Sequence, residues 1–95
     1  MTIICVSATI ERIHGFLRSV MLNPHPGVYV SSQLSRSVQN QIWAILVEWF
    51  QVAPVGTIVM ITRKKGAPLD LEICTLGAPR RMIREMDGQF VIERQ

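Results

Sequence analysis

The sequence predicts an α+β domain, in which a β-sheet carries two helices on one face. The run Gly27-Val28-Tyr29-Val30 is rich in β-branched and aromatic residues, which is typical of a buried strand. The stretch that follows has apolar residues at the spacing of one helical face, namely Val38, Ile42, Ile45, Leu46 and Trp49. A strand that leads into such a helix is the repeating unit of a compact domain with mixed secondary structure, and the unit occurs twice here.

The first unit begins with an apolar strand at residues 2–7. We expect Ser7 or Thr9 to cap the helix that follows, because a side-chain oxygen can accept a bond from a free N–H of the first turn. Pro24 and Pro26 should end this helix by residue 23. Its predicted apolar face comprises Ile10, Ile13, Leu17, Val20 and Met21.

The second unit has its strand at residues 28–31, which a very short strand could precede. Ser35 is the expected cap of the second helix, which should run to about Phe50. Pro54 and Gly56 then close it before a third strand at 57–62.

The residue pattern after residue 63 predicts further strands. Residues 64–68 form a turn, and residues 69–76 then alternate apolar and polar side chains, as in a half-exposed hairpin strand. Asp87-Gly88 is a tight-turn signal before a short strand at 89–93. The order β-α-β-α-β-β predicts a ferredoxin-like sheet. We expect 69–76 and 89–93 to lie beyond that core and to take part in dimer or partner contacts, because a free edge strand tends to pair.

Length and composition agree with one domain over residues 1–95. The chain is 48% hydrophobic, which is sufficient for a core but near the size at which burial through dimerisation adds stability. The formal charge of +3 favours a polyanionic partner. No 18-residue apolar run and no signal-peptide pattern are present, so we expect a cytoplasmic protein without membrane contact.

Basic residues are few but grouped. One group occupies the predicted linker after Leu76-Gly77, and others lie on or near the two helices. The candidate nucleic-acid-binding residues are Arg12, His14, Arg36, Arg80, Arg81 and Arg84. Guanidinium groups bind phosphate through bidentate charge-assisted bonds. We expect contacts to backbone and shape, since the sequence has neither zinc-finger spacing nor the aromatic ladder of RNA-binding sheets. Lys64-Lys65 are equally well explained as a solvated hairpin tip.

No catalytic residue, metal site or cofactor is predicted. The acidic residues are scattered, and Asp70 and Glu72, which share a predicted strand face, both look solvent-exposed. Cys5 and Cys74 lie in predicted strands without Cys-x-x-Cys spacing, so we expect reduced, buried thiols.

Four matches in order resemble the second CRISPR-associated protein of type I-E systems, the small dimeric partner of the CRISPR integrase. They are residues 12–17 (Arg-Ile-His-Gly-Phe-Leu), Gly27 to Val30, Ile42-Trp43, and the segment from Leu76-Gly77 through Arg80-Arg81 to Asp87-Gly88. The resemblance covers most of the chain. It implies an antiviral-defence protein, a ferredoxin-like homodimer that bridges two integrase dimers and holds double-stranded DNA during spacer acquisition.

The resemblance also assigns residues. Arg12 matches a DNA-backbone arginine of the first helix, and His14 stands where the family has a second arginine. Arg80 and Arg81 match paired DNA-contacting arginines. The family's basic pair near the start of the second helix falls on Ser37 and Gln39, where Arg36 is the nearest charge.

Catalysis is where this sequence departs from its relatives. Other branches carry an acid at the end of the first strand, linked to metal-dependent nuclease activity, whereas this chain has Ser7 there. A hydroxyl is a weak magnesium ligand compared with a carboxylate. The sequence therefore favours a non-catalytic adaptor. The alternatives are a Mg²⁺-dependent endoribonuclease or endodeoxyribonuclease, or a small stand-alone regulator with the same fold.

Overall fold

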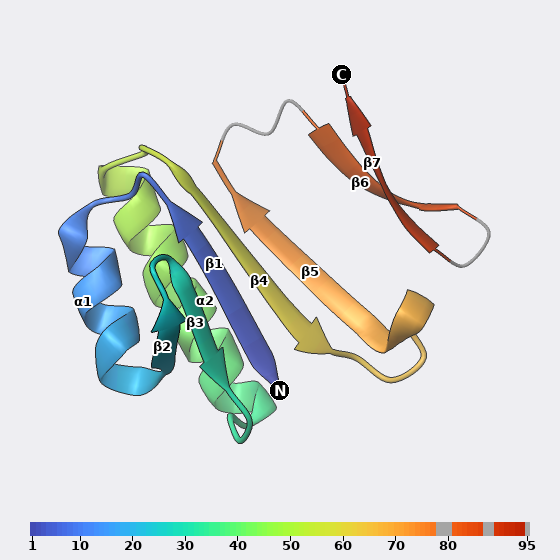
Figure 1. Cartoon of the computed structure of the whole chain (residues 1–95), viewed down its shortest axis with the longest axis horizontal. Helices are drawn as coiled ribbons and strands as arrows, with labels where there is room; N and C mark the ends of the chain where they lie inside the picture. Colours follow the sequence, from blue (N-terminus) through green and yellow to red (C-terminus); the bar gives the residue numbers. More distant parts are fainter. Residues whose placement is uncertain (78–80, 87–88, 95) are drawn as a thin grey trace.

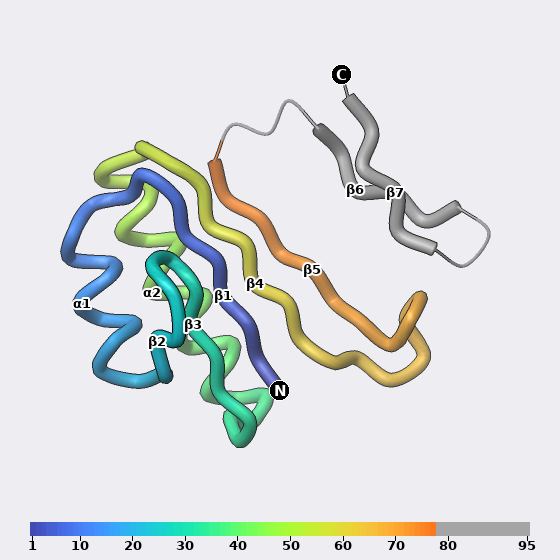
Figure 2. Tube along the Cα trace, viewed as in Figure 1, coloured from blue at the N-terminus to red at the C-terminus, as the bar shows by residue number. Residues whose placement is uncertain are grey.

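The computed structural model describes the backbone of residues 1–77, 81–86 and 89–94, and the side chains of residues 1–77. In chain order, the elements are β1 (Thr2–Ser7), α1 (Glu11–Val20), β2 (Leu22–His25), β3 (Val28–Ser31), α2 (Arg36–Val52), β4 (Thr57–Arg63), the short 3₁₀-helix η1 (Pro68–Asp70), β5 (Leu71–Leu76), β6 (Arg81–Met86) and β7 (Gln89–Arg94). Figures 1 and 2 show their arrangement. The predicted α+β class is confirmed.

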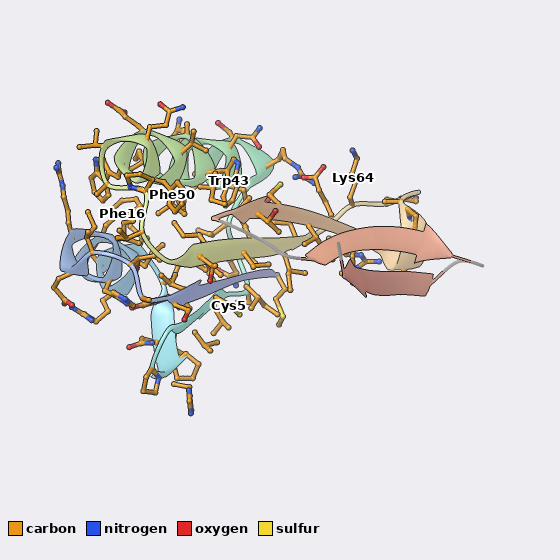
Figure 3. All side chains as sticks on the ribbon, turned by 90° about the horizontal axis from the view of Figure 1, so that it is seen from above. Cys5, Phe16, Trp43, Phe50 and Lys64 are labelled. Atoms are coloured by element: carbon orange, nitrogen blue, oxygen red, sulfur yellow. The ribbon has the colours of Figure 1, made fainter. Side chains whose placement is uncertain are left out.

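Five strands form one antiparallel sheet in the order β2-β3-β1-β4-β5, and β6 pairs with β7 in a separate two-stranded sheet. The two helices cover one face of the larger sheet, as expected for a ferredoxin-like fold (Figures 1 and 3). One expectation about the sheet is wrong. The predicted strand at 69–76 does not lie beyond the core, because β5 pairs with β4 over six residues and becomes an edge of the main sheet.

The core lies between the sheet and the helices. Ile4, on the central strand β1, is fully buried between Tyr29 of β3 and Met60 of β4, its register partners. The helices contribute the buried side chains of Ile13, Leu17, Ile42 and Leu46. Because side chains alternate across a strand, the even-numbered residues of β1 and β4 face the helices.

The start of α1 differs from the prediction. Ile10 is the cap residue, and no side chain caps the helix. Thr9 precedes the cap residue, and its hydroxyl lies 3.3 Å from Nε2 of His14. Ala8 turns the chain out of β1 with a left-handed φ of 58°. Val20, expected on the apolar face, is 41% exposed. The predicted Ser35 cap of α2 is confirmed, since its hydroxyl accepts a bond from the backbone N–H of Val38 at 3.2 Å.

The loop between β4 and β5 is longer than predicted. Asp70 belongs to η1 and does not share a strand face with Glu72. Its carbonyl accepts the backbone N–H of Lys64 at 2.8 Å, and its side chain accepts the N–H of Gly66 at 3.2 Å. These bonds close the loop and delay the strand until Leu71.

The C-terminal strands also differ in part from the prediction. Arg81 and Arg84 were expected in a linker, but they lie in β6, which is paired with β7 by six register partners. The predicted strand at 89–93 corresponds to β7. Arg80 and the Asp87-Gly88 turn fall outside the described residues.

Candidate nucleic-acid interface

Arg12 lies on α1 and stacks on α2. Its guanidinium carbon is 4.3 Å from the ring centroid of Trp49, and the same indole meets Phe16 edge-on at a centroid distance of 5.3 Å. Stacking uses the flat face of the guanidinium and leaves its N–H donors, which lie in the plane, at the rim. Arg12 is exposed, and no acceptor among the described residues bonds to it. The aromatic contact therefore fixes this cation while leaving its donors available to a phosphate.

His14 faces the opposite way, toward the chain itself. Nδ1 is 2.7 Å from the hydroxyl of the buried Tyr29, and Nε2 is 3.3 Å from the hydroxyl of Thr9. Both ring nitrogens are thus engaged by side chains of the same protein. The arrangement ties α1 to β3, so a direct phosphate contact from His14 would require breaking one of these bonds.

Arg36, the first residue of α2, is held by neighbours. One guanidinium nitrogen bonds Oε1 of Glu72 at 3.0 Å, and another donates to the carbonyl of Arg63 at 3.1 Å. Lys64 bonds the second carboxylate oxygen of Glu72 at 3.2 Å. The hydrogen bond from the Lys64 ammonium lowers the pKa of the Glu72 carboxyl, and the nearby Arg36 guanidinium lowers it further by a smaller amount. Figure 3 shows Lys64 on the same side of the sheet as α2.

The candidate residues are not gathered in one site. Arg12 lies beside Trp49 near the end of α2, whereas Arg36 begins this helix, so about thirteen residues at roughly 1.5 Å each separate the two cations by about 20 Å. Gln39, at one position of the family's basic pair, is buried and donates to the hydroxyl of Thr2 at 2.9 Å. Arg80 lies outside the described residues. Arg81 and Arg84 lie in β6, and the structure does not describe their side chains.

Sequence reasoning missed two positioning residues, Trp49 and Glu72. It had assigned Trp49 to packing and Glu72 to a solvated strand face. The sequence does contain an indication of the Glu72 ion pair, because an acid on the strand that follows a Lys-Lys turn is well placed to pair with one of those lysines. Nothing in the sequence indicated that Arg12 would reach Trp49, which is 37 residues away.

The acids whose side chains are described, within residues 1–77, do not form a magnesium site near Ser7. Glu11 is the nearest in sequence, and it is paired with Arg18 at 2.5 Å, which lowers the pKa of the Glu11 carboxyl. Glu72 is engaged at the other end of α2. Within residues 1–77, 81–86 and 89–94, no three His, Cys, Asp or Glu side chains come close enough to hold a metal ion. The donor set present there does not fit a divalent cation, which prefers several convergent oxygens.

The chain matches the family described as CRISPR-associated protein (Cas_Cas2CT1978) over residues 1–91. The chain belongs to this family. Membership assigns it to the CRISPR machinery, with a role in adaptation, and confirms the family suspected from the four sequence matches. No curated protein matches the chain. In the described part of this CRISPR-associated protein, no helix is long and apolar enough to span a membrane.

The sheet of this CRISPR-associated protein has a second face, which is not covered by either of the two described helices. One row of register partners crosses all five strands, and each member is apolar: Leu22, Val30, Ile3, Ile61 and Ile73. A neighbouring row contains Val28, Cys5 and Val59. Figure 3 shows Cys5 on the side of the sheet away from α2. Leu22 is 70% exposed, and the other members of the two rows are half-buried. We call these two rows the open face.

The cysteines lie on opposite faces of this sheet. Cys5 belongs to the open face, and Cys74 packs against the core on the helical side. Both are free thiols, as expected, but both are half-buried rather than buried. Desolvation raises the pKa of the Cys74 thiol, which keeps it protonated and unreactive at neutral pH.

Proposed function

We propose that this protein is a non-catalytic, dimeric DNA-binding adaptor of the CRISPR spacer-acquisition complex, which bridges integrase dimers and holds duplex DNA in the cytoplasm. The observation that carries the proposal is the open face. An apolar row across five strands, with no helix over it, is the kind of surface that a second copy of the same sheet can cover.

Pairing through the open face has a consequence for DNA binding. The helices lie on the other side of the sheet, so a face-to-face dimer leaves both helical layers outside. Arg12 of each copy then remains exposed beside Trp49. The dimer presents cations from both copies, which suits a rigid polyanion such as duplex DNA.

The paired arginines Arg80 and Arg81 complete the proposed contact, as the family resemblance implies. Guanidinium groups bind phosphate, and the sequence has neither zinc-finger spacing nor the aromatic ladder of RNA-binding sheets, so binding should be independent of sequence. Integrase binding is the remaining part of the adaptor role, and it rests on family membership.

The experiment that tests the proposal combines co-purification with duplex binding. The protein is co-expressed with the integrase of its own locus, and we expect a complex that contains two copies of this chain. Separately, the affinity for an unrelated-sequence duplex is measured against salt concentration, for wild type and Arg12→Ala. Because the dimer carries two copies of Arg12, the substitution should reduce the salt slope by about 0.9 for each copy that contacts the duplex, up to about 1.8. An unchanged slope would remove Arg12 from the interface, and failure to recover any complex would overturn the adaptor role.

Nuclease activity is tested in the same preparations. RNA and DNA, single- and double-stranded, are incubated with magnesium or manganese, together with the Glu11→Ala and Asp70→Ala variants. We expect no cleavage above background, because the carboxylates of residues 1–77 do not converge near Ser7. Metal-dependent cleavage that either substitution abolishes would refute the adaptor-only function and assign that acid to catalysis.

A further inference from the structure

The corner where α2, β4 and β5 meet contains a cation pair that already binds an anion. Arg36 and Lys64 come from different elements and grip the two oxygens of one carboxylate, that of Glu72, at 3.0 and 3.2 Å. Arg36 also donates to the carbonyl of Arg63, which sets the orientation of its guanidinium. Two cations that each take a different oxygen of one planar anion form the arrangement that recognises a phosphate group.

We infer that Arg36 and Lys64 form a phosphate-binding site of which Glu72 is the built-in competitor. The ligand class is a phosphate oxyanion of a nucleic-acid backbone, and the inference rests on the proposed DNA-binding function. In the free protein, the carboxylate occupies the site. A backbone phosphate binds there only by displacing it, so Glu72 sets how strongly this end of α2 contributes to DNA affinity.

Exposure makes displacement feasible. The side chains of Arg36 and Lys64 are 45% and 57% exposed, and that of Glu72 is 31% exposed. Ion pairs with this much access to water are individually weak, so an incoming phosphate can replace them. The corner also holds Lys65 beside Lys64 in the turn, which raises the local density of positive charge. The site and Arg12 lie at opposite ends of α2, about 20 Å apart, which corresponds to about six base pairs of duplex.

A purely structural function for this ion triad makes a different prediction. If Glu72 only fastens α2 to the sheet, neutralising it should slightly lower the melting temperature and leave DNA affinity unchanged. If Glu72 competes with phosphate, the same change should raise affinity, because both cations become free to bind the ligand.

The test compares Glu72→Gln with Glu48→Gln. Both substitutions remove one negative charge, but Glu48 is exposed on α2 and makes no ion pair among the described residues. Duplex affinity is measured across a range of salt concentrations. We expect Glu72→Gln to bind about three- to thirtyfold more tightly at low salt, and its salt slope to steepen by about 0.9 for each cation recruited. Glu48→Gln should show only the smaller gain that follows from its net charge.

A double variant locates the effect. Adding Arg36→Ala to Glu72→Gln should remove the share of the gain that Arg36 supplies and leave only the share of Lys64. An equal gain in Glu48→Gln, a gain that is undiminished without Arg36, or no gain in Glu72→Gln would each overturn the inference.

Binding of inorganic pyrophosphate, followed by NMR of the arginine side chains, separates this inference from the proposed function. If wild type and Glu72→Gln fail to bind DNA while Glu72→Gln binds pyrophosphate through Arg36, the DNA-binding function is wrong and the site stands. If wild type binds DNA and Glu72→Gln gains nothing for either ligand, the site is wrong and the function stands.

Discussion

Replacing Ile61 with lysine should separate the proposed dimer into monomers. Ile61 lies in the apolar row of the open face, between its register partners Ile3 and Ile73. Complete burial of an isoleucine is worth about 1.5–3 kcal/mol, and Ile61 is already half-buried, so pairing gains about 1 kcal/mol per copy. Twofold symmetry doubles this to about 2 kcal/mol, or roughly a thirtyfold change in the dissociation constant. Burying an unpaired ammonium adds several kcal/mol more.

We therefore expect the dimer of Ile61→Lys to dissociate more than about a hundredfold more readily than wild type. Sedimentation velocity across a concentration series measures this directly, with the 10.7 kDa monomer as the reference. The control is Val52→Lys, which introduces the same side chain at a residue of α2 that is 83% exposed. Circular dichroism confirms that both variants fold. If folded Ile61→Lys remained as dimeric as the control, or if wild type were monomeric, the open face would not be the dimer interface.

Two further predictions concern DNA binding and stability. Arg80→Ala combined with Arg81→Ala should weaken binding to all duplex sequences alike and lower the salt slope by about 0.9 for each arginine that contacts the duplex, up to about 3.6 for the four arginines of a dimer, as filter binding at several salt concentrations would show; a loss confined to one sequence would contradict a backbone contact. Gly56→Ala should destabilise the fold by more than about 1 kcal/mol, because Gly56 has a φ of +78° and an added Cβ would collide with backbone atoms at the end of β1. Gly15→Ala is its matched control, since its Cβ would meet open space in a helix, and it should instead stabilise by about 0.5–1 kcal/mol in thermal or denaturant unfolding. Equal effects of the two glycine substitutions would show that backbone crowding at Gly56 is not important.

The elements that the sequence predicted well are those in which local signals and tertiary packing agree. Ser35 supplies a cap, and Ile42 and Leu46 supply a helical face, so α2 was predicted within two residues at its C-terminal end. The β4–β5 loop was predicted less well. Its 3₁₀ turn depends on bonds that the Asp70 carbonyl and side chain make to Lys64 and Gly66, and residue alternation contains no information about such bonds.

The open face could be derived from alternation, but its significance could not. Val59 and Ile61 were expected in a strand, and a strand with apolar residues on both faces is typical of a buried position. Only the register shows that Ile61 is aligned with Ile3 and Ile73 on a face without helices. The sequence-based argument for a dimer relied instead on a small core and a free hairpin edge, whereas the dimer proposed above uses the face of the sheet.

The candidate interface shows why charge counting is a poor guide to phosphate contacts. Residues 1–77 contain six Lys and Arg residues, and three of them, Arg18, Arg36 and Lys64, are paired with carboxylates. Arg12 and Arg36 look equivalent in the sequence, as exposed arginines near a helix start. The structure distinguishes them by partners distant in sequence. Trp49 supports Arg12 without using its donors, while Glu72 occupies those of Arg36. Affinity for a polyanion therefore depends on which cations have free donors, and in this protein a single carboxylate controls two of them.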